Sequence, residues 1–298
     1  MCLLYVLRKA KEDTNKNNIL YILGYKHGFI FNIMINILKK HNVKVLLNPG
    51  RIKHTRFNHF LLKKIVNNTD YVICASRVNE KYLRELTDNI TYIPYGASID
   101  EVKEIDKITH SLMEKYDIKS RDYYLMVGSF VKYNNFEYII SEFIDSKIDK
   151  DLVIVSNFSE KKKYYKQILK IVDFRSNKHI KFVGNIYDDE ILRKIRKYAK
   201  GYIQCNSVNE TSPSLLESLS ITDISIVLDS EYNREVADDS VLYFTTSIGS
   251  LKEKLLEVEK YRSKEFLDYG EKAKNIIKAE YTWDLAVKKH EKLFKKLF

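Results

Sequence analysis

The chain has 298 residues, of which 45% are hydrophobic and 31% are charged, and its formal net charge is +11. These values are typical of a globular protein with two core-bearing domains or one large one. The apolar run "FIFNIMINIL" is too short to span a bilayer and is broken by Asn32 and Asn36. The sequence therefore excludes a membrane-spanning protein. The opening "MCLLYVLRK" lacks the pattern of a signal peptide, so we expect a cytoplasmic protein.

The net positive charge would suit a nucleic-acid partner, but its distribution argues against one. Lysines are scattered through helical stretches such as "SEKKKYYKQILKI", interleaved with apolar positions. Solvated helix faces explain that pattern better, so we expect no nucleic acid. Attraction to an anionic membrane surface remains an alternative.

Three cysteines, Cys2, Cys74 and Cys205, are far apart in the sequence, and the seven histidines have no metal-ligand spacing. Cys74 and Cys205 each end an apolar run that resembles a buried strand. We therefore expect reduced core cysteines, with no disulfide and no metal site.

Short apolar runs alternate with longer stretches of helical periodicity along the whole chain. The runs that predict strands are, in order, "ILYIL", "KVLL", "YVICA", "TYIP", "YYLMVG", "DLVIVS", "IKFVG", "GYIQC", "ISIVLD" and "VLYF". Helical periodicity covers 135–146, 160–173, 188–199 and the terminal stretch that contains Trp283. This alternation predicts βαβ units, and therefore an α/β protein with parallel sheets.

A polar segment after Pro94 and Gly96 divides these elements into about four predicted strands before it and six after it. We therefore expect a reduced first domain at 1–105, a complete doubly wound domain at 106–280 and a final helix at 281–298. Gly96, Gly128 and Gly184 close strand-like runs, where ligands of open α/β sheets bind. An ordinary turn at each glycine is the alternative interpretation.

The segment "SVNETSPSLLESLS", residues 207–220, follows the predicted strand "GYIQC". Pro213 fits the first position of a helix and Ser212 its cap, and Ser214 with Glu217 matches a capping box by spacing. The same helix start would suit a nucleotide-sugar, because its amides bind phosphates and a carboxylate one turn later can accept ribose hydroxyls. Spacing alone leaves both interpretations open.

This segment resembles "GGTNPSLLEAL" of the rhamnosyltransferases of bacterial capsule and rhamnose-polysaccharide synthesis, a branch of family 4 glycosyltransferases. Other segments agree in order over nearly the whole chain, including "NPG" at 48–50, "DYVICASRVNEKYL" at 70–83, "TYIPYGA" at 91–97, "YYLMVGSFVKYNNFEYII" at 123–140 and "YTWDLAVKKHEKLF" at 281–294. The resemblance implies a GT-B fold of two Rossmann-like domains, with the last helix crossing back to the first domain, which is shortened here.

The activity that this resemblance implies is retaining transfer of a rhamnose-like hexose. The donor would be a dTDP- or UDP-sugar, and the acceptor a glycan or a lipid-diphosphate-linked sugar. No metal and no other cofactor would be needed, because helix amides and basic side chains stabilise the leaving diphosphate. The protein would then lie in the cytoplasm, with a peripheral position at the inner face of the plasma membrane as the alternative.

The resemblance also assigns residues by position. The donor-binding set is Gly128, Ser129, Lys132, Asn134, Asn209, Glu210, Thr211, Ser212, Pro213, Ser214, Leu215 and Glu217, with Glu217 at the ribose. The acceptor-side set is Asn48, Gly50 and Arg56. No pattern singles out a general base or nucleophile. For His27, His54 and His59 we expect surface or packing roles, with an acid–base role as the alternative.

Several positions depart from the family pattern. Ser129 stands where the relatives carry an arginine, so the diphosphate contact is lost unless Lys132 replaces it. Asn209 and Glu210 stand where the relatives carry glycine. Losing one charge-stabilising donor commonly lowers the rate about 100- to 1000-fold. A non-catalytic homologue that binds a partner transferase or an acceptor glycan is therefore the alternative function.

Overall fold

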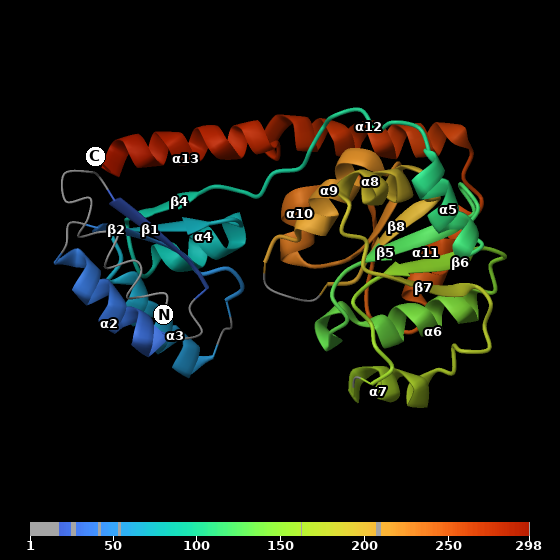
Figure 1. Cartoon of the computed structure of the whole chain (residues 1–298), viewed down its shortest axis with the longest axis horizontal. Coiled ribbons are helices and arrows are strands. Elements are labelled where there is room, and N and C mark those ends of the chain that lie inside the picture. The colour runs from blue at the N-terminus through green and yellow to red at the C-terminus, as the bar shows by residue number, and fades with distance from the viewer. Residues whose placement is uncertain are drawn as a thin grey trace. The chain divides into compact units, whose positions relative to one another are not determined.

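The computed structural model describes residues 18–24, 28–40, 43–52, 55–161, 163–206 and 210–297, with backbone only for 28–31. The chain forms two compact units (Figure 1). Unit 1 comprises Met1–Tyr95, Val208–Thr211 and Trp283–Phe298, and unit 2 comprises Gly96–Ser207 and Ser212–Thr282.

The chain leaves unit 1 at Tyr95, earlier than the division expected at 105. Side chains of unit 2 hold the residues that follow. Arg193 donates to the carbonyl of Asp100 and Lys197 to that of Val102, each at 2.6 Å. The polar segment therefore packs as part of unit 2 over much of its length.

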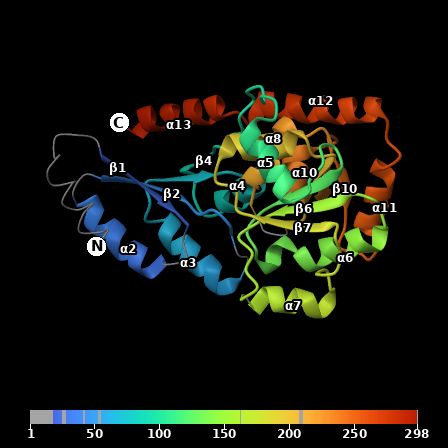
Figure 2. The ribbon, with the colours of Figure 1, turned by 45° about the vertical axis from the view of Figure 1, so that its right-hand side comes forward.

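Unit 1 is built on a four-stranded parallel sheet in the order β1-β2-β3-β4. Its strands are β1 (Asn18–Leu23), β2 (Val43–Asn48), β3 (Tyr71–Cys74) and β4 (Ile90–Tyr92), and its helices are α2 (Gly28–Lys39), α3 (Arg56–Val66), α4 (Arg77–Arg84) and α13 (Trp283–Leu297). Figures 1 and 2 show α13 on one side of this sheet and α2 and α3 on the other.

Side chains that alternate along the strands of unit 1 form two separate cores. Val45 and Leu47 face α3 and pack with Leu62. Leu46, between them, points the other way and packs with Leu293 of α13. Successive strand residues point to opposite faces, and both faces of a parallel sheet need cover. The final helix is therefore part of the core of unit 1.

Unit 2 is built on a six-stranded parallel sheet in the order β10-β9-β8-β5-β6-β7. Its strands are β5 (Tyr123–Val127), β6 (Asp151–Val155), β7 (Ile180–Gly184), β8 (Gly201–Gln204), β9 (Ser225–Leu228) and β10 (Leu242–Phe244). The helices are α5 (Lys107–Lys115), the short η1 (Lys132–Asn134), α6 (Phe136–Ser146), α7 (Lys163–Ile171), α8 (Asp189–Lys197), α9 (Pro213–Ile221), α10 (Glu231–Ala237), α11 (Ser250–Val258) and α12 (Ser263–Glu280).

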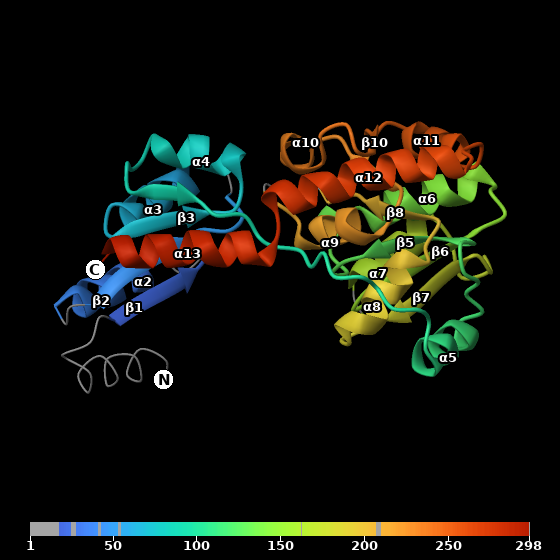
Figure 3. The same cartoon turned by 90° about the horizontal axis from the view of Figure 1, so that it is seen from above.

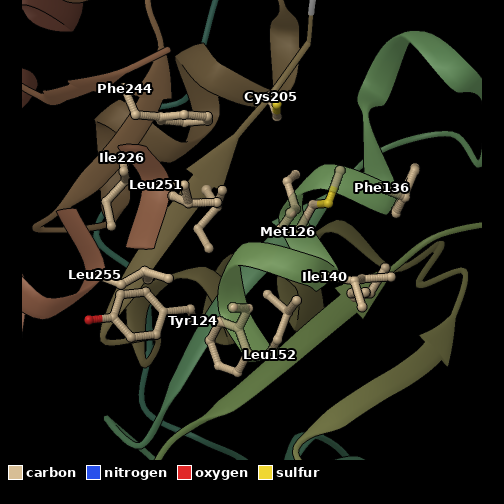
Figure 4. Packing of buried hydrophobic residues seen from close by; sticks show 14 of the residues in the cluster. Tyr124, Met126, Phe136, Ile140, Leu152, Cys205, Ile226, Phe244, Leu251 and Leu255 are labelled. Atoms are coloured by element: carbon tan, nitrogen blue, oxygen red, sulfur yellow. The ribbon is translucent and has the colours of Figure 1, made fainter. Parts of the chain in front are cut away.

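Helices cover both faces of this second sheet. On one face, Tyr124 and Met126 of β5 pack with Phe136 of α6 and Leu251 of α11 (Figure 4). On the other face, the hydroxyl of Tyr123 donates to a carbonyl of α8 at 2.6 Å. Figure 3 shows α9 and α12 lying side by side, as their contacts require.

The expected fold class is confirmed. Each of the ten apolar runs forms a strand. In the described part of the chain every strand pairing is parallel, and the strands form one sheet of four and one of six. Cys74 and Cys205 are buried free cysteines, as expected, whereas Cys2 lies outside the described residues. None of the helices in the described ranges is long and apolar enough to cross a bilayer.

Candidate functional site

The order of strands in unit 2 creates a switch point between β5 and β8. From β5 the chain winds through β6 and β7 in one direction, and from β8 it winds through β9 and β10 in the other. In doubly wound sheets, ligands bind beyond the carboxyl ends of the two strands where the order reverses. The donor-side residues assigned in unit 2 follow β5 and β8 in the chain, so most of them lie at this edge.

The loop after β5 is held by two asparagines. Asn134 is buried and its amide donates to the carbonyl of Ser129 at 2.7 Å. A Cβ at Gly128 would lie 3.0 Å from that same amide nitrogen, so glycine lets the loop close onto Asn134. Asn135 has a left-handed backbone and donates to the carbonyl of Cys205 at 2.9 Å, which ties the loop to the end of β8.

Two residues of the β5 loop remain exposed at the switch point. Ser129 and Lys132 are both exposed, and Lys132 forms no ion pair with the described residues. Asn134, in contrast, holds the loop from inside. Lys132 is therefore exposed to solvent, whereas Asn134 is buried and holds the loop in place.

A polar network lies beneath the start of α9. The buried hydroxyl of Tyr202 lies 2.7 Å from the side-chain oxygen of Gln204 and 2.9 Å from the hydroxyl of Ser214. Gln204 in turn donates to the Ser212 hydroxyl at 3.2 Å. Burial raises the pKa of Tyr202 to about 12, so its hydroxyl keeps its proton at neutral pH. These hydrogen bonds hold the start of α9 against the end of β8.

Helix α9 begins as the sequence predicts at its cap. Ser212 is the N-cap and accepts from the amide of Leu215, and Pro213 occupies the first helical position. The capping box expected between Ser214 and Glu217 is wrong, because Ser214 already lies inside the helix. Glu217 points instead to Arg196 of α8, with Oε2 2.6 Å from Nη1.

The ion pair of Arg196 and Glu217 is asymmetric in exposure. The Arg196 side chain is 3% exposed and the Glu217 side chain is 39% exposed. A second guanidinium nitrogen of Arg196 donates to the Ser214 hydroxyl at 3.4 Å. Arg196 thus fixes Glu217 beside the start of α9 while leaving part of its carboxylate in solvent.

Cys205, at the end of β8, is close to these groups, but its thiol is a poor nucleophile. Burial raises the pKa of its thiol to about 12, with the hydrogen bond to Asn135 opposing that shift. A thiol that keeps its proton is a poor nucleophile.

The acceptor-side residues Asn48 and Gly50 meet at the carboxyl edge of the sheet in unit 1. The amide of Gly50 donates to the Asn48 side chain at 2.9 Å, and Gly50 has the positive φ of 60° that glycine adopts without strain. They border a cavity of about 10 Å³, which is room for one water molecule. Arg56 is exposed at the start of α3 and does not line this cavity.

Glu210 and Thr211, assigned to the donor side, belong to unit 1 by their contacts. Both line the cavity beside Asn48 and Gly50, and the Thr211 hydroxyl donates to the carbonyl of Ala75 at 3.0 Å. Asn209 lies outside the described residues. The assigned donor set is therefore divided, and Glu210 and Thr211 lie with the acceptor-side residues.

Sequence reasoning missed four residues at these sites, Tyr21, Tyr95, Arg196 and Gln204. Tyr21 contacts Asn48 at 3.3 Å, and burial together with the nearby Glu210 carboxylate raises the pKa of Tyr95. Tyr95 could have been found, because it directly precedes a strand-closing glycine. Arg196 gave no signal, since its partners lie 18 and more residues away in the chain.

Of the three histidines considered from the sequence, one, His59, lies within the described ranges. His59 Nδ1 lies 2.6 Å from the Tyr82 hydroxyl and so links α3 to α4, whereas His27 and His54 lie outside the described residues. Within the described ranges, no group of three or more His, Cys, Asp or Glu side chains could hold a metal ion.

Comparison with known proteins shows which proteins the chain resembles. No family model matches the chain. An uncharacterised glycosyltransferase of Methanocaldococcus jannaschii is 27% identical over 245 residues, which are 79% of this chain and 60% of that protein. The chain thus spans about three fifths of the length of this curated relative.

Solved structures are similar over almost the whole chain. A glycosyltransferase from Rickettsia africae superposes with a TM-score of 0.81 at 15% identity, over 99% of this chain and 80% of the other. HepE of Anabaena, solved with UDP and glucose, gives 0.80 at 12% identity over 97% and 80%. The fold is therefore that of the GT-B glycosyltransferases, with Rossmann-like parallel sheets.

Proposed function

We propose that the chain is a glycosyltransferase that binds a nucleotide-sugar at the carboxyl edge of the sheet in unit 2. This proposal rests on two independent arguments that point to the same edge of the sheet. The strand order alone points to the switch point between β5 and β8. The family resemblance assigns its donor residues to the loops and the helix that follow those same two strands.

The start of α9 offers the chemistry that a diphosphate requires. Pro213 has no amide to donate, and the Ser214 amide meets no acceptor among the described residues. Such an amide, at the positive end of a helix, stabilises negative charge. Lys132 supplies a positive charge from the loop after β5. As the bond between the sugar and the diphosphate breaks, these groups stabilise the charge that gathers on the leaving diphosphate.

Glu217 is the residue we assign to the ribose of the donor. Its carboxylate is partly exposed beside the helix start and is held by Arg196 at 2.6 Å. Carboxylate oxygens accept hydrogen bonds from hydroxyls, and a carboxylate fixed in advance loses little entropy on binding. The cavity group of Asn48, Gly50, Glu210 and Thr211 in unit 1 is assigned to the acceptor side.

The finer identity follows from the co-linear segments. We propose a dTDP- or UDP-linked donor, a rhamnose-like hexose transferred with retention, and a glycan or lipid-linked acceptor in bacterial surface polysaccharide synthesis. The curated relative in M. jannaschii is itself named as a glycosyltransferase, and the HepE structure holds UDP and glucose. The bound UDP and glucose of HepE are in keeping with a nucleotide-sugar as donor.

Ligand-dependent stability tests the donor site. A nucleotide-sugar at about 100 times its dissociation constant should add about 2.7 kcal/mol to the apparent stability. We expect a thermal shift with one of the dTDP-, UDP- or GDP-sugars, and a much smaller shift for Glu217→Gln. The amide oxygen of that variant can still accept from Arg196. Each variant's shift is measured against its own ligand-free unfolding temperature, so a lower stability of the variant is separated from the loss of the ligand contact. Glu231→Gln, at the exposed start of α10, is the matched control and should respond like the wild type.

Two results would count against this proposal. If no nucleotide-sugar shifted the unfolding temperature, a non-catalytic homologue that binds a partner transferase or a glycan would be favoured instead. If the shift occurred but was unaltered in Glu217→Gln, the assigned ribose contact would be wrong.

A further inference from the structure

Helix α3 of unit 1 presents two aromatic side chains to solvent. Phe57 is 71% exposed and Phe60 is 64% exposed. They are three residues apart, so they lie next to each other on the outer face of the helix. The opposite face is fully used, because Leu62, Ile65 and Val66 are buried in the core of unit 1.

Basic residues surround these two rings. Arg56, Lys63 and Lys64 are exposed, and the sequence of α3, "RFNHFLLKKIV", contains no acidic residue. An interfacial helix that binds anionic lipid has this composition, with aromatic side chains that enter the headgroup region and cations that stay at its surface. The charge pattern selects a negatively charged partner.

A cap, a contact with α4 and its buried face hold the helix in unit 1. Thr55 caps its first turn by accepting from the amide of Asn58. His59 contacts the Tyr82 hydroxyl at 2.6 Å, which joins α3 to α4. The two phenylalanines are therefore held in place at the surface, and their exposure does not come from a frayed helix end.

We propose that the outer face of α3, formed by Arg56, Phe57, Phe60, Lys63 and Lys64, docks on an anionic lipid bilayer. The two rings enter the headgroup region and the three cations pair with anionic headgroups. The proposal does not depend on transferase activity. If the proposed function also holds, docking through unit 1 would bring the acceptor-side residues of that unit to lipid-linked acceptors.

Vesicle flotation tests this surface. We expect the full chain to float with vesicles of phosphatidylcholine containing 30% phosphatidylglycerol, to bind pure phosphatidylcholine weakly, and to be released at high salt. Each cation near an anionic surface contributes about fivefold to binding, so Lys63→Gln with Lys64→Gln should weaken partitioning roughly 25-fold. Removing both rings, in Phe57→Ser with Phe60→Ser, should weaken it by about tenfold or more.

Matched controls come from α12 of unit 2. Lys264→Gln with Lys278→Gln removes two exposed charges, and Leu267→Ser removes an apolar side chain that is 61% exposed. Both variants should float like the wild type. Because Phe57 and Phe60 are exposed, the double serine variant should keep its circular dichroism spectrum and its unfolding temperature.

Three outcomes would overturn the proposal. These are flotation unchanged in the double serine variant, equal binding to neutral and anionic vesicles, and a dimer in solution that the same serine substitutions dissociate. The last result would make a second copy of the chain the occupant of this face. Nucleotide-dependent thermal shifts, measured without vesicles, should not change in these variants, so docking and donor binding can fail separately.

Discussion

At the residue scale, the ion pair between Arg196 and Glu217 links the proposed donor site to the buried part of unit 2. The Arg196 side chain is 3% exposed and the Glu217 side chain is 39% exposed, so losing the ion pair costs Arg196 more than it costs Glu217. Removing the carboxylate leaves a buried cation without its anionic partner, which is costly. Removing the cation leaves a carboxylate that water can still solvate.

We therefore predict unequal effects of the two single substitutions. Glu217→Ala should lower the free energy of unfolding of unit 2 by about 3 kcal/mol, and Arg196→Met by about 1 kcal/mol. Urea denaturation followed by circular dichroism would measure both. Equal losses in the two variants would show that the burial of Arg196 does not control the energetics of this pair.

At the element scale, α13 completes the sheet of unit 1. Ala286 and Leu293 pack on Leu46, Tyr71 and Ile73, which point away from α2, α3 and α4. Without α13 these side chains would face water. The helix at the end of the chain thus stabilises the sheet near its beginning.

Truncating one contact of α13 should accordingly destabilise unit 1. We predict that Leu293→Ala, at a side chain that is 5% exposed, lowers its free energy of unfolding by about 2–3 kcal/mol. Val287→Ala, on the same helix but 52% exposed, should change it by less than about 0.5 kcal/mol. Urea midpoints monitored by the fluorescence of Trp283 would compare the two, and similar losses would contradict the role of α13.

At the scale of the whole molecule, each unit has its own sheet and its own hydrophobic cores. Chains with separate cores often unfold in more than one step. Trp283, the single tryptophan, belongs to unit 1, so its fluorescence serves as the probe of that unit. Most helices belong to unit 2, so circular dichroism reports mainly on it.

We predict that tryptophan fluorescence and circular dichroism give different unfolding midpoints. A nucleotide-sugar bound to unit 2 should raise the midpoint seen by circular dichroism and leave the fluorescence midpoint almost unchanged. Coincident transitions that shift together with ligand would instead indicate a single cooperative unit.

Much of this architecture could be predicted from local pattern. The ten apolar runs form ten parallel strands. A short apolar run between two stretches of helical periodicity buries both of its faces when it is a strand of a parallel sheet covered by helices. Ser212 and Pro213 were correctly predicted as the cap and first residue of α9. These features depend on neighbours within a few residues.

The sequence by itself thus determined the fold class, the strands and the start of α9, because hydrophobic periodicity and helix capping are local properties. Only the tertiary structure decided that Glu217 pairs with Arg196 instead of closing a capping box, that Glu210 and Thr211 lie with Asn48 and Gly50, and that the polar segment after Tyr95 packs on α8. The physical reason is that these contacts join residues far apart in the chain. Their partners are selected by the packing of helices and loops on the sheets, for which spacing along the sequence carries no signal.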